Sequence, residues 1–164
     1  MAELILAPIS EVDAERVATE LSAANWHGDR YPAEHAAGTR AALVAAWDGV
    51  FVGHLSVLWR SDYLPFRERD TPEISNFNVL PQYRRRRIGT ALMDAAEELI
   101  AARGDIAGIG VGLYADYTPA HIMYLRRGYL PDGRGIAYRD VTVAPGAQVR
   151  VDDDLVLWMT RKLR

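Results

Sequence analysis

The stretch from residue 74 to residue 99 constrains the fold of this chain more than any other part of it. An apolar run over residues 74–80 leads into four consecutive arginines at 84–87, and apolar residues at helical spacing follow. Cations at the start of a helix oppose its dipole and cost roughly 0.3 kcal/mol or more each unless an anion binds nearby. Free amides at a helix start and guanidinium donors together favour phosphate. The stretch therefore predicts a strand, a tight loop and a helix that bind a phosphate or diphosphate group.

An arginine run has other interpretations when it is taken alone. It is also typical of a solvated face, a nuclear-localisation patch or a nucleic-acid contact. The flanking strand and the buried helix face at Ile88, Leu92, Ala95 or Ala96, and Leu99 favour the phosphate site. The formal net charge is −3, whereas nucleic-acid-binding domains are usually strongly basic, so we expect no nucleic-acid partner.

Length and composition narrow the class of protein further. The 164 residues suit a single domain over residues 1–164, and 49% hydrophobic with 25% charged residues is typical of a globular chain. The chain has no cysteine, which excludes disulfides, thiolate metal sites and an acyl-cysteine intermediate. No stretch reaches the roughly 18 apolar residues of a membrane span, and the first residues do not resemble a secretion signal. We therefore expect a cytoplasmic protein that does not bind a membrane.

The order of predicted elements indicates an α/β fold with a mixed sheet flanked by helices. The strongest local signal is Asp48-Gly49 between two apolar runs, which predicts a tight hairpin. The predicted elements are a strand over 4–9, a helix capped by Ser10 or Asp13, a short helix opening at Pro32, hairpin strands over 41–47 and 50–59, a loop over 60–71, a strand over 72–80, a helix over 88–102, a strand over 106–113, a helix over 118–127, and final strands within 129–143 and over 155–160.

Two motifs in this frame resemble the GNAT N-acetyltransferases, which take an acetyl group from acetyl-coenzyme A. The first motif matches at Val79, Pro81, Arg84, Gly89, Ala91 and Leu92, with Arg87 where the family usually has a glycine. The second matches at Ala120, Tyr124, Gly128 and Tyr129, with Tyr117 in place of a frequent asparagine and Met123 in place of a leucine. The resemblance implies a GNAT-like mixed, mostly antiparallel sheet of about seven strands flanked by about four helices.

The resemblance also implies a function and a set of binding residues. The chain would move an acetyl group from acetyl-coenzyme A to a primary amine by direct attack, without a covalent enzyme intermediate. The strand end would bind the pantetheine arm and the loop the diphosphate. The coenzyme-binding residues implied are Phe77, Asn78, Val79, Arg84, Arg85, Arg86, Arg87, Ile88, Gly89, Thr90 and Tyr117. Two alternatives stay open: an acyl-coenzyme A-binding sensor or interaction module that has lost turnover, and a small nucleic-acid binder.

Glu73 is the best candidate for a general base. An amine of pKa about 10.4 must lose a proton before it attacks, which costs on the order of 4 kcal/mol at neutral pH. Several GNAT enzymes place a glutamate about this far before the motif valine, and strand alternation would put Glu73, Ser75, Phe77 and Val79 on one side. A solvated carboxylate at the strand end, with a water chain as the base, is the alternative.

Tyr124 matches the family's tyrosine that hydrogen-bonds the coenzyme sulfur as the thiolate leaves. Full proton transfer from a phenol to a thiolate is uphill by roughly 2 kcal/mol, so stabilisation of charge is as plausible as acid catalysis. A packed tyrosine with a wet hydroxyl is the alternative. The resemblance also makes the amide of Val79 the candidate donor to the thioester carbonyl oxygen.

The remaining polar and aromatic residues give weaker signals. His27, His35, His54 and His121 lack metal-ligand spacing, so we expect no metal. Asp152, Asp153 and Asp154 form either a solvated run or an attractor for a cationic amine. Trp26, Tyr31, Trp59 and Tyr63 would line an acceptor pocket or fill the edge of the core. The acceptor is a small-molecule or peptide amine that the sequence does not identify, and a homodimer remains open.

Overall fold

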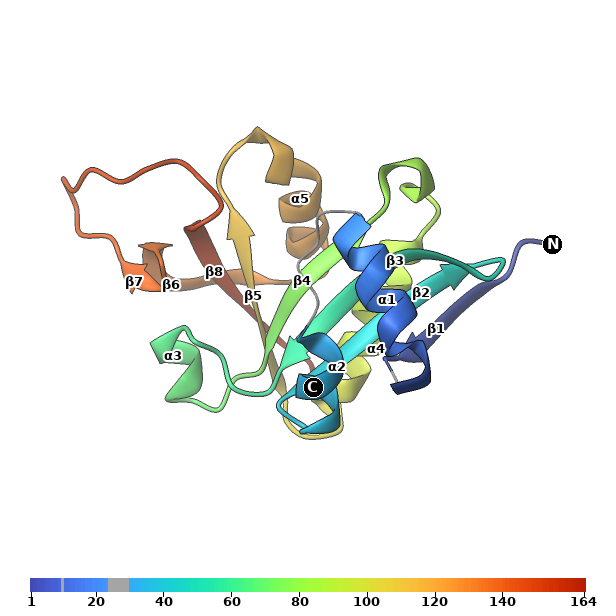
Figure 1. Cartoon of the computed structure of the whole chain (residues 1–164). Helices are drawn as coiled ribbons and strands as arrows, with labels where there is room; N and C mark the ends of the chain where they lie inside the picture. The colour runs from blue at the N-terminus through green and yellow to red at the C-terminus, as the bar shows by residue number, and fades with distance from the viewer. Residues whose placement is uncertain (10, 24–29) are drawn as a thin grey trace.

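The computed structural model describes residues 1–9, 11–23 and 30–164, and eight strands in these residues form one open sheet (Figure 1). The strand order is β1-β2-β3-β4-β5-β8-β6-β7, and all neighbours are antiparallel except the parallel pair β4 and β5. The strands are β1 (Leu4–Pro8), β2 (Arg40–Trp47), β3 (Val50–Leu58), β4 (Glu73–Val79), β5 (Ile106–Gly112), β6 (Leu130–Tyr138), β7 (Val141–Thr142) and β8 (Leu155–Lys162). The mixed, mostly antiparallel sheet is confirmed, and the strand beyond the expected seven is the two-residue β7.

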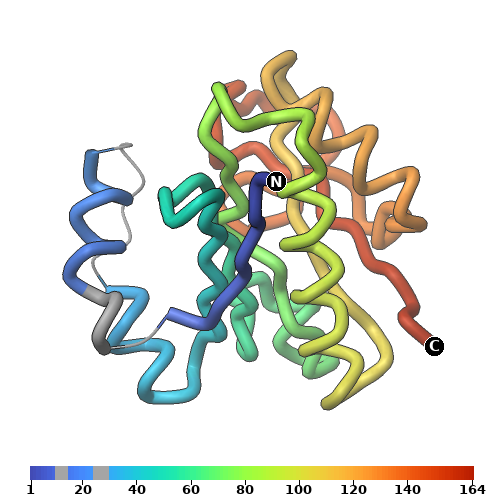
Figure 2. The backbone as a smooth tube through the Cα atoms, turned by 90° about the vertical axis from the view of Figure 1, so that its right-hand side faces the viewer, coloured from blue at the N-terminus to red at the C-terminus, as the bar shows by residue number. Residues whose placement is uncertain are grey.

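Helices cover both faces of this sheet. The helices of the described residues are α1 (Glu11–Ala23), α2 (Tyr31–Ala36), α3 (Leu64–Arg67), α4 (Ile88–Ala101) and α5 (Thr118–Arg126). Figure 2 shows α1 and α2 on one side of the sheet and α4 on the other. The predicted capping residue Ser10 lies outside the described residues. The region over 60–71 is not all loop as predicted, because Pro65 sits in the first turn of α3, where its missing N–H costs no helical bond.

The hairpin between β2 and β3 forms as predicted. Trp47 pairs with Val50 across the turn. Asp48 and Gly49 both have positive φ, 49° and 80°, as the tight type I′ turn requires. This turn fixes the register of β2 and β3 next to it.

The face of α4 that packs on the sheet differs by one residue from the prediction. Ile88, Leu92 and Ala96 are buried as expected, but Leu99 is 37% exposed and Ile100 is fully buried in its place. Three successive steps of about one helical turn lead from Ile88 through Leu92 and Ala96 to Ile100, so Leu99 falls outside the stripe. The buried face of the helix is therefore shifted from the predicted one, toward Met93 and Ile100.

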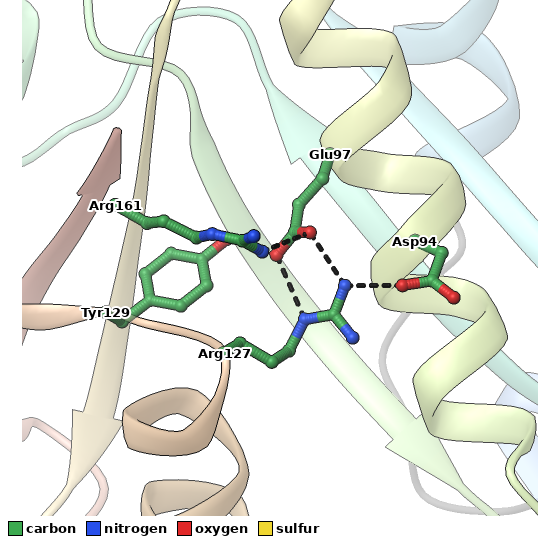
Figure 3. Close-up of polar contacts among 5 residues, drawn as sticks. All are labelled: Asp94, Glu97, Arg127, Tyr129 and Arg161. Carbon is green, nitrogen blue, oxygen red and sulfur yellow. Dashed lines mark hydrogen bonds and ion pairs between the residues drawn. The ribbon is translucent and has the colours of Figure 1, made fainter. Parts of the chain in front are cut away.

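A buried polar centre ties α4 to the end of α5 and to β8 (Figure 3). Glu97 of α4 is 9% exposed and accepts hydrogen bonds from Arg127 Nε at 3.0 Å and Nη2 at 2.7 Å. Arg161 of β8 donates to the same carboxylate at 2.6 Å, and the Tyr129 hydroxyl donates at 3.0 Å. Arg127 also donates to Asp94 at 2.6 Å. Two guanidinium groups thus balance two carboxylates, which is the arrangement that a buried charge requires.

Within the described residues, none of the helices is both long and apolar enough to cross a bilayer.

Candidate active site

A cleft opens where the parallel strands β4 and β5 separate. The two strands pair only at Glu73 with Gly108 and Ile74 with Ile109, and beyond these pairs they diverge. The cleft between them has a volume of about 350 Å³. Its walls include Glu73, Ser75, Phe77, Asn78, Tyr117, Tyr124, Asp153 and Trp158.

A β-bulge in β4 changes which side chains face which side. Ser75 pairs with Ser56 and Asn78 with His54, so two residues of β4 oppose one residue of β3, and Asn76 has a φ of 50°. The prediction that Glu73, Ser75, Phe77 and Val79 share one side is therefore wrong. Phe77 and Val79 pack with Ile74 against the core under α4, whereas Glu73 and Ser75 face the opposite side.

The Glu73 carboxylate lies at the closed end of the cleft in a corner made by the segment before α3. Only 9% of the residue is exposed. The Ser61 hydroxyl donates to its Oε2 at 2.5 Å, and the Tyr63 N–H donates to the Ser61 Oγ at 3.1 Å. Burial raises the pKa of Glu73 to about 7, and the negative charges of Asp140 and Asp62 add to that increase. A carboxyl group of this kind exchanges a proton near neutral pH.

Tyr124 borders the same cleft from α5. It is 5% exposed and belongs to the core under α4, and its ring lies 6.1 Å from that of Tyr129. Burial raises the pKa of the Tyr124 phenol above its usual range. The phenol therefore keeps its proton at neutral pH.

Glu73 and Tyr124 reach the cleft from opposite faces of the sheet. Alternation along β5 puts Ala107 and Ile109 toward α4, so Gly108 faces the other way, where the Phe66 ring of α3 occupies the place of a side chain. Glu73 pairs with Gly108 and faces that α3 side, while Tyr124 lies on the α4 side. The cleft is therefore bordered by a carboxyl group on one face of the sheet and by a phenol on the other.

The arginine loop between β4 and α4 adopts two left-handed residues. After the short 3₁₀ helix η1 (Pro81–Tyr83), Arg85 has a φ of 61°, and Arg87, the residue before the helix, has a φ of 63°. Glycine takes this conformation without strain, which accounts for the glycine that the related motif usually has at the position of Arg87. At the motif's second glycine, Gly89, an added Cβ would lie 3.0 Å from the Phe77 ring. A side chain at this position would fit only if the Phe77 ring moved by a few tenths of an ångström.

The first amides of α4 are available to an external acceptor. The bond from the Ala91 N–H to the Arg87 carbonyl, at 3.0 Å, opens the helix. The N–H groups of Ile88, Gly89 and Thr90 precede it and have no acceptor within the helix. These amides and the positive end of the helix dipole favour an anion at this place.

Two of the four arginine side chains already have partners in the protein. Arg84 Nε donates to the carbonyl of Val79 at 3.1 Å, and the Arg86 guanidinium lies 5.5 Å from the Trp47 ring centre and 5.3 Å from that of Tyr83. Arg84 shapes the strand end, and Arg86 packs the loop onto β2. Arg85 and Arg87 remain as the cations best suited to a bound anion.

The Val79 amide points into the opening between the strands. Leu80 N–H donates to the Val52 carbonyl at 2.8 Å, and Val79 pairs with Gly53. Because ladder bonds alternate along an antiparallel strand, the Val79 N–H points away from β3. On that side β5 has already diverged, so the ladder of the sheet does not use this donor.

Tyr117 is held by the segment before β8. Its hydroxyl donates to Asp153 Oδ1 at 2.8 Å, the Tyr114 hydroxyl donates to the same oxygen, and its ring lies over Gly112. These two donors lower the pKa of Asp153. The other residues of the acidic run are also engaged, Asp152 by the Tyr138 hydroxyl at 3.0 Å and Asp154 by Arg139 at 3.1 Å. The run thus anchors a loop as well as carrying charge.

The aromatic residues considered for an acceptor pocket mostly pack elsewhere. Tyr31 is buried under Arg40 in the core beside α1, and Tyr63 stacks on Trp158 with ring centres 4.6 Å apart. Trp59 packs under Arg103 at a second hollow of about 260 Å³. Trp26 lies outside the described residues. The tryptophan that does border the cleft is Trp158, which the sequence analysis did not single out.

The histidines are dispersed. His35 Nδ1 accepts the Ala42 N–H at 3.1 Å, and burial, together with Arg40, lowers the pKa of His54 to about 4. No group of three or more potential metal ligands occurs among the residues that the structure describes, and His27 lies outside them.

Ser61 and the Glu97 centre carry no signal in the sequence that predicts their roles. Ser61 lies 12 positions from Glu73, and Glu97 lies 30 and 64 positions from its two arginines. The sequence Ser-Asp-Tyr-Leu before Pro65 signals a turn at most. Only the folded arrangement of the elements brings these groups together.

The structure thus combines an open mixed sheet, a splayed parallel pair of strands and a loop that leads into a helix with free first amides. The family model described as the Acetyltransferase (GNAT) family matches residues 10–129. The chain therefore belongs to this family of acetyl-coenzyme A-dependent acyltransferases.

Solved structures of the same fold cover the whole chain at low sequence identity. An acetyltransferase of the GNAT family from Streptococcus pneumoniae aligns with a TM-score of 0.69 at 14% identity, over 98% of this chain and 99% of that one. Aminoglycoside 6′-acetyltransferase type Ii aligns with a TM-score of 0.65 at 20% identity, over 98% and 97%. The PaiA N-acetyltransferase from Thermoplasma acidophilum, in complex with coenzyme A, gives 0.63 at 12% identity, over 98% and 99%. Among curated proteins, no sequence matches the chain.

Proposed function

We propose that residues 1–164 form a single N-acetyltransferase domain that moves an acetyl group from acetyl-coenzyme A to a primary amine by direct attack. The observation that carries this proposal is the single cleft bordered by Glu73 on one face of the sheet and Tyr124 on the other. Direct attack needs a proton acceptor beside the amine and a donor beside the leaving sulfur. The absence of cysteine agrees with a mechanism that has no acyl-cysteine intermediate.

The residues around the cleft suit acetyl-coenzyme A, which would supply an activated acetyl thioester. The free amides of Ile88, Gly89 and Thr90, with Arg85 and Arg87 beside them, are donors for a diphosphate. The strand end at Phe77 to Val79 offers unpaired backbone groups to the pantetheine arm, and Val79 N–H can donate to the thioester oxygen as charge develops. The family match and a neighbour solved with coenzyme A support this assignment.

Glu73 and Tyr124 have complementary roles in this proposal. Glu73, whose pKa burial raises to about 7, accepts the proton of the ammonium acceptor near neutral pH. Tyr124, whose pKa is raised by burial, donates a hydrogen bond to the departing sulfur and keeps its proton. Asp62 and Asp140 near Glu73 favour a cationic acceptor, and an aminoglycoside acetyltransferase among the structural neighbours is consistent with such an amine.

The test is thiol release from acetyl-coenzyme A against a panel of amines. We expect Glu73→Gln to lower kcat/KM by about 10²-fold or more, and Tyr124→Phe to lower kcat by about 10²-fold while coenzyme binding persists. Glu68→Gln and Tyr138→Phe, outside the cleft, serve as matched controls. If neither cleft variant alters turnover of any accepted amine, the catalytic roles are wrong.

The alternative of a coenzyme-binding sensor has one observation in its favour. Tyr117 stands where a coenzyme-binding asparagine is frequent, and Asp153 already holds its hydroxyl. Calorimetry separates the two functions, since a sensor binds acetyl-coenzyme A with no thiol release for any amine. Absence of both binding and turnover would contradict the transferase and the sensor together.

A further inference from the structure

We propose that Ser61 is a positioning residue for Glu73: its hydroxyl holds the carboxylate in the ionised form and in the place where it accepts the proton of the amine. This proposal rests on the role of Glu73 as the base.

The direction of the hydrogen bonds at Ser61 follows from the donors present. Ser61 is fully buried, and its Oγ receives the Tyr63 N–H at 3.1 Å. The hydroxyl has a single proton, and Glu73 Oε2, at 2.5 Å, is the acceptor that lies against it. The chain of bonds therefore runs from the Tyr63 amide through Ser61 to Glu73 and ends on the carboxylate oxygen.

This series of hydrogen bonds favours the ionised form of Glu73 over the protonated form. Protonation of Glu73 would replace the anionic acceptor of the fully buried Ser61 hydroxyl with a weaker neutral one, and hydrogen bonds to charged groups are the stronger ones. The hydroxyl bonds of Ser61 and Ser75 accordingly lower the pKa of Glu73, against the larger effect of burial. Ser61 thus keeps a strongly buried base able to ionise near neutral pH.

The charged groups around Glu73 act in the opposite direction. Asp62 lies next to Ser61 in the loop before α3, and Asp140 lies in the turn between β6 and β7; both raise the pKa of Glu73. The strand neighbours that pair with Glu73, Leu58 and Gly108, carry no charge. Of the groups that act on Glu73, the serine hydroxyls are the ones that favour its ionisation.

Removal of the Ser61 hydroxyl should therefore raise the pH at which Glu73 titrates, and not merely reduce activity. A hydrogen bond to a charged group corresponds to about one pKa unit or more. For Ser61→Ala we expect the acidic limb of the kcat/KM profile to move up by about one pH unit. At pH 6 the variant should be about tenfold slower than the wild type, and near pH 9 the two rates should converge. A purely structural defect would lower the rate at every pH.

Ser56→Ala is the matched control. Ser56 is also a fully buried serine, and it lies on the strand next to Glu73, but its Oγ has no hydrogen-bond partner among the described residues. Both variants lose a serine Oγ, but only the Oγ of Ser61 contacts the Glu73 carboxylate. We expect the Ser56→Ala profile to superimpose on that of the wild type.

A carboxyl ¹³C NMR titration of glutamate-labelled protein gives a readout that needs no substrate. The Glu73 signal is identified by its loss in Glu73→Gln, and its midpoint should rise by about one unit in Ser61→Ala and stay in place in Ser56→Ala. Ser61→Cys, nearly the same size with a weaker donor, replaces the alanine variant if that variant does not fold.

The outcomes separate the two proposals. An unchanged NMR midpoint in Ser61→Ala or Ser61→Cys overturns the role of Ser61 even if Glu73→Gln is inactive. Full turnover by Glu73→Gln overturns the role of Glu73 as base, and the positioning role of Ser61 with it. Parallel shifts of the NMR midpoint and the acidic limb support both.

Discussion

Glu73 and Glu97 are buried to the same degree, each 9% exposed. The charged groups around the two residues nevertheless have opposite signs. Glu97 faces Arg127 and Arg161, which cancel its charge with short ion pairs. Glu73 faces a serine hydroxyl and the like charges of Asp62 and Asp140. The first carboxylate is paired with two guanidinium groups that balance its charge. The second is held close to its point of ionisation and borders a cleft.

The difference gives the two centres opposite effects on stability. A paired buried carboxylate loses its counter-charges when it is neutralised, whereas an unpaired one is relieved of an unfavourable charge. Neutral isosteres at the two positions should therefore change the free energy of unfolding with opposite signs. Buried charge is a stabilising element only where the fold supplies the partner.

The largest effect is expected for Glu97→Gln. The substitution leaves Arg161 without its carboxylate and Arg127 with only Asp94, and broken buried pairs typically cost about 3 kcal/mol. Urea unfolding at pH 7 should therefore show a loss of about 3 kcal/mol in the free energy of unfolding. Glu98→Gln, at the exposed neighbouring position, should stay within about 0.5 kcal/mol of the wild type. Equal effects of the two variants would contradict the charge balance assigned to this centre.

The second-largest effect is expected for Glu73→Gln. It is a gain in the free energy of unfolding, and it depends on pH. Because the pKa of Glu73 is raised from 4.5 to about 7, the folded state retains a proton that the unfolded state releases between these values. The free energy of unfolding therefore falls as pH rises through this window, by up to about 3 kcal/mol. Since the carboxylate borders an open cleft, we expect Glu73→Gln to be more stable than the wild type by about 2 kcal/mol at pH 8.

At pH 4.5 the same pair of proteins should differ little, since Glu73 is protonated in the folded wild type. Unfolding curves at several pH values measure this difference directly. A Glu73→Gln variant that is less stable than the wild type at pH 8 would show that the carboxylate has a cationic partner.

Much of the scaffold around these two residues follows from local sequence signals. Asp48-Gly49 sets the hairpin, and the run through Val79, Pro81 and Gly89 sets the strand, the loop and the helix in order. These signals act over a few residues, through φ preferences and helical or strand spacing. Element order was therefore predictable from the sequence.

The side chains that distinguish the two carboxylates were not predictable in the same way. The bulge at Asn76 reverses the facing of β4, and simple alternation does not signal it. Glu97 looks like any charged residue on a helix until Arg127 and Arg161 are brought beside it. Ser61 meets Glu73 only because α3 folds under the sheet. Contacts between separate elements depend on packing that a single sequence does not encode locally.

A smaller loss of stability is expected when the uncharged hydrogen-bond donor at the Glu97 centre, the Tyr129 hydroxyl, is removed. Tyr129 is fully buried, and its hydroxyl donates to Glu97 Oε1 at 3.0 Å. Tyr129→Phe removes this bond while both arginines remain, so we expect a loss of about 1 kcal/mol in the free energy of unfolding. Tyr138→Phe, whose hydroxyl bonds Asp152 at the surface, is the control and should lose less. A loss as large as that of Glu97→Gln would mean that the phenol, and not charge balance, holds the centre together.

The smallest expected change in stability tests the negative charge of Asp140 beside Glu73. Asp140 has a φ of 65°, and asparagine adopts this conformation as readily as aspartate, so Asp140→Asn changes the charge with little change in the backbone. Without this negative neighbour the pKa of Glu73 should fall toward its usual value, and the protein should gain about 0.5 kcal/mol at pH 8. Asp94→Asn is the counterpart at the Glu97 centre: it removes a charge that pairs with Arg127 and should cost a similar amount. Urea unfolding of the two variants under the same conditions measures the sign of each change in the free energy of unfolding. If both substitutions stabilise, or both destabilise, the two carboxylates do not differ in their charged surroundings in the way that sets a base apart from a structural ion pair.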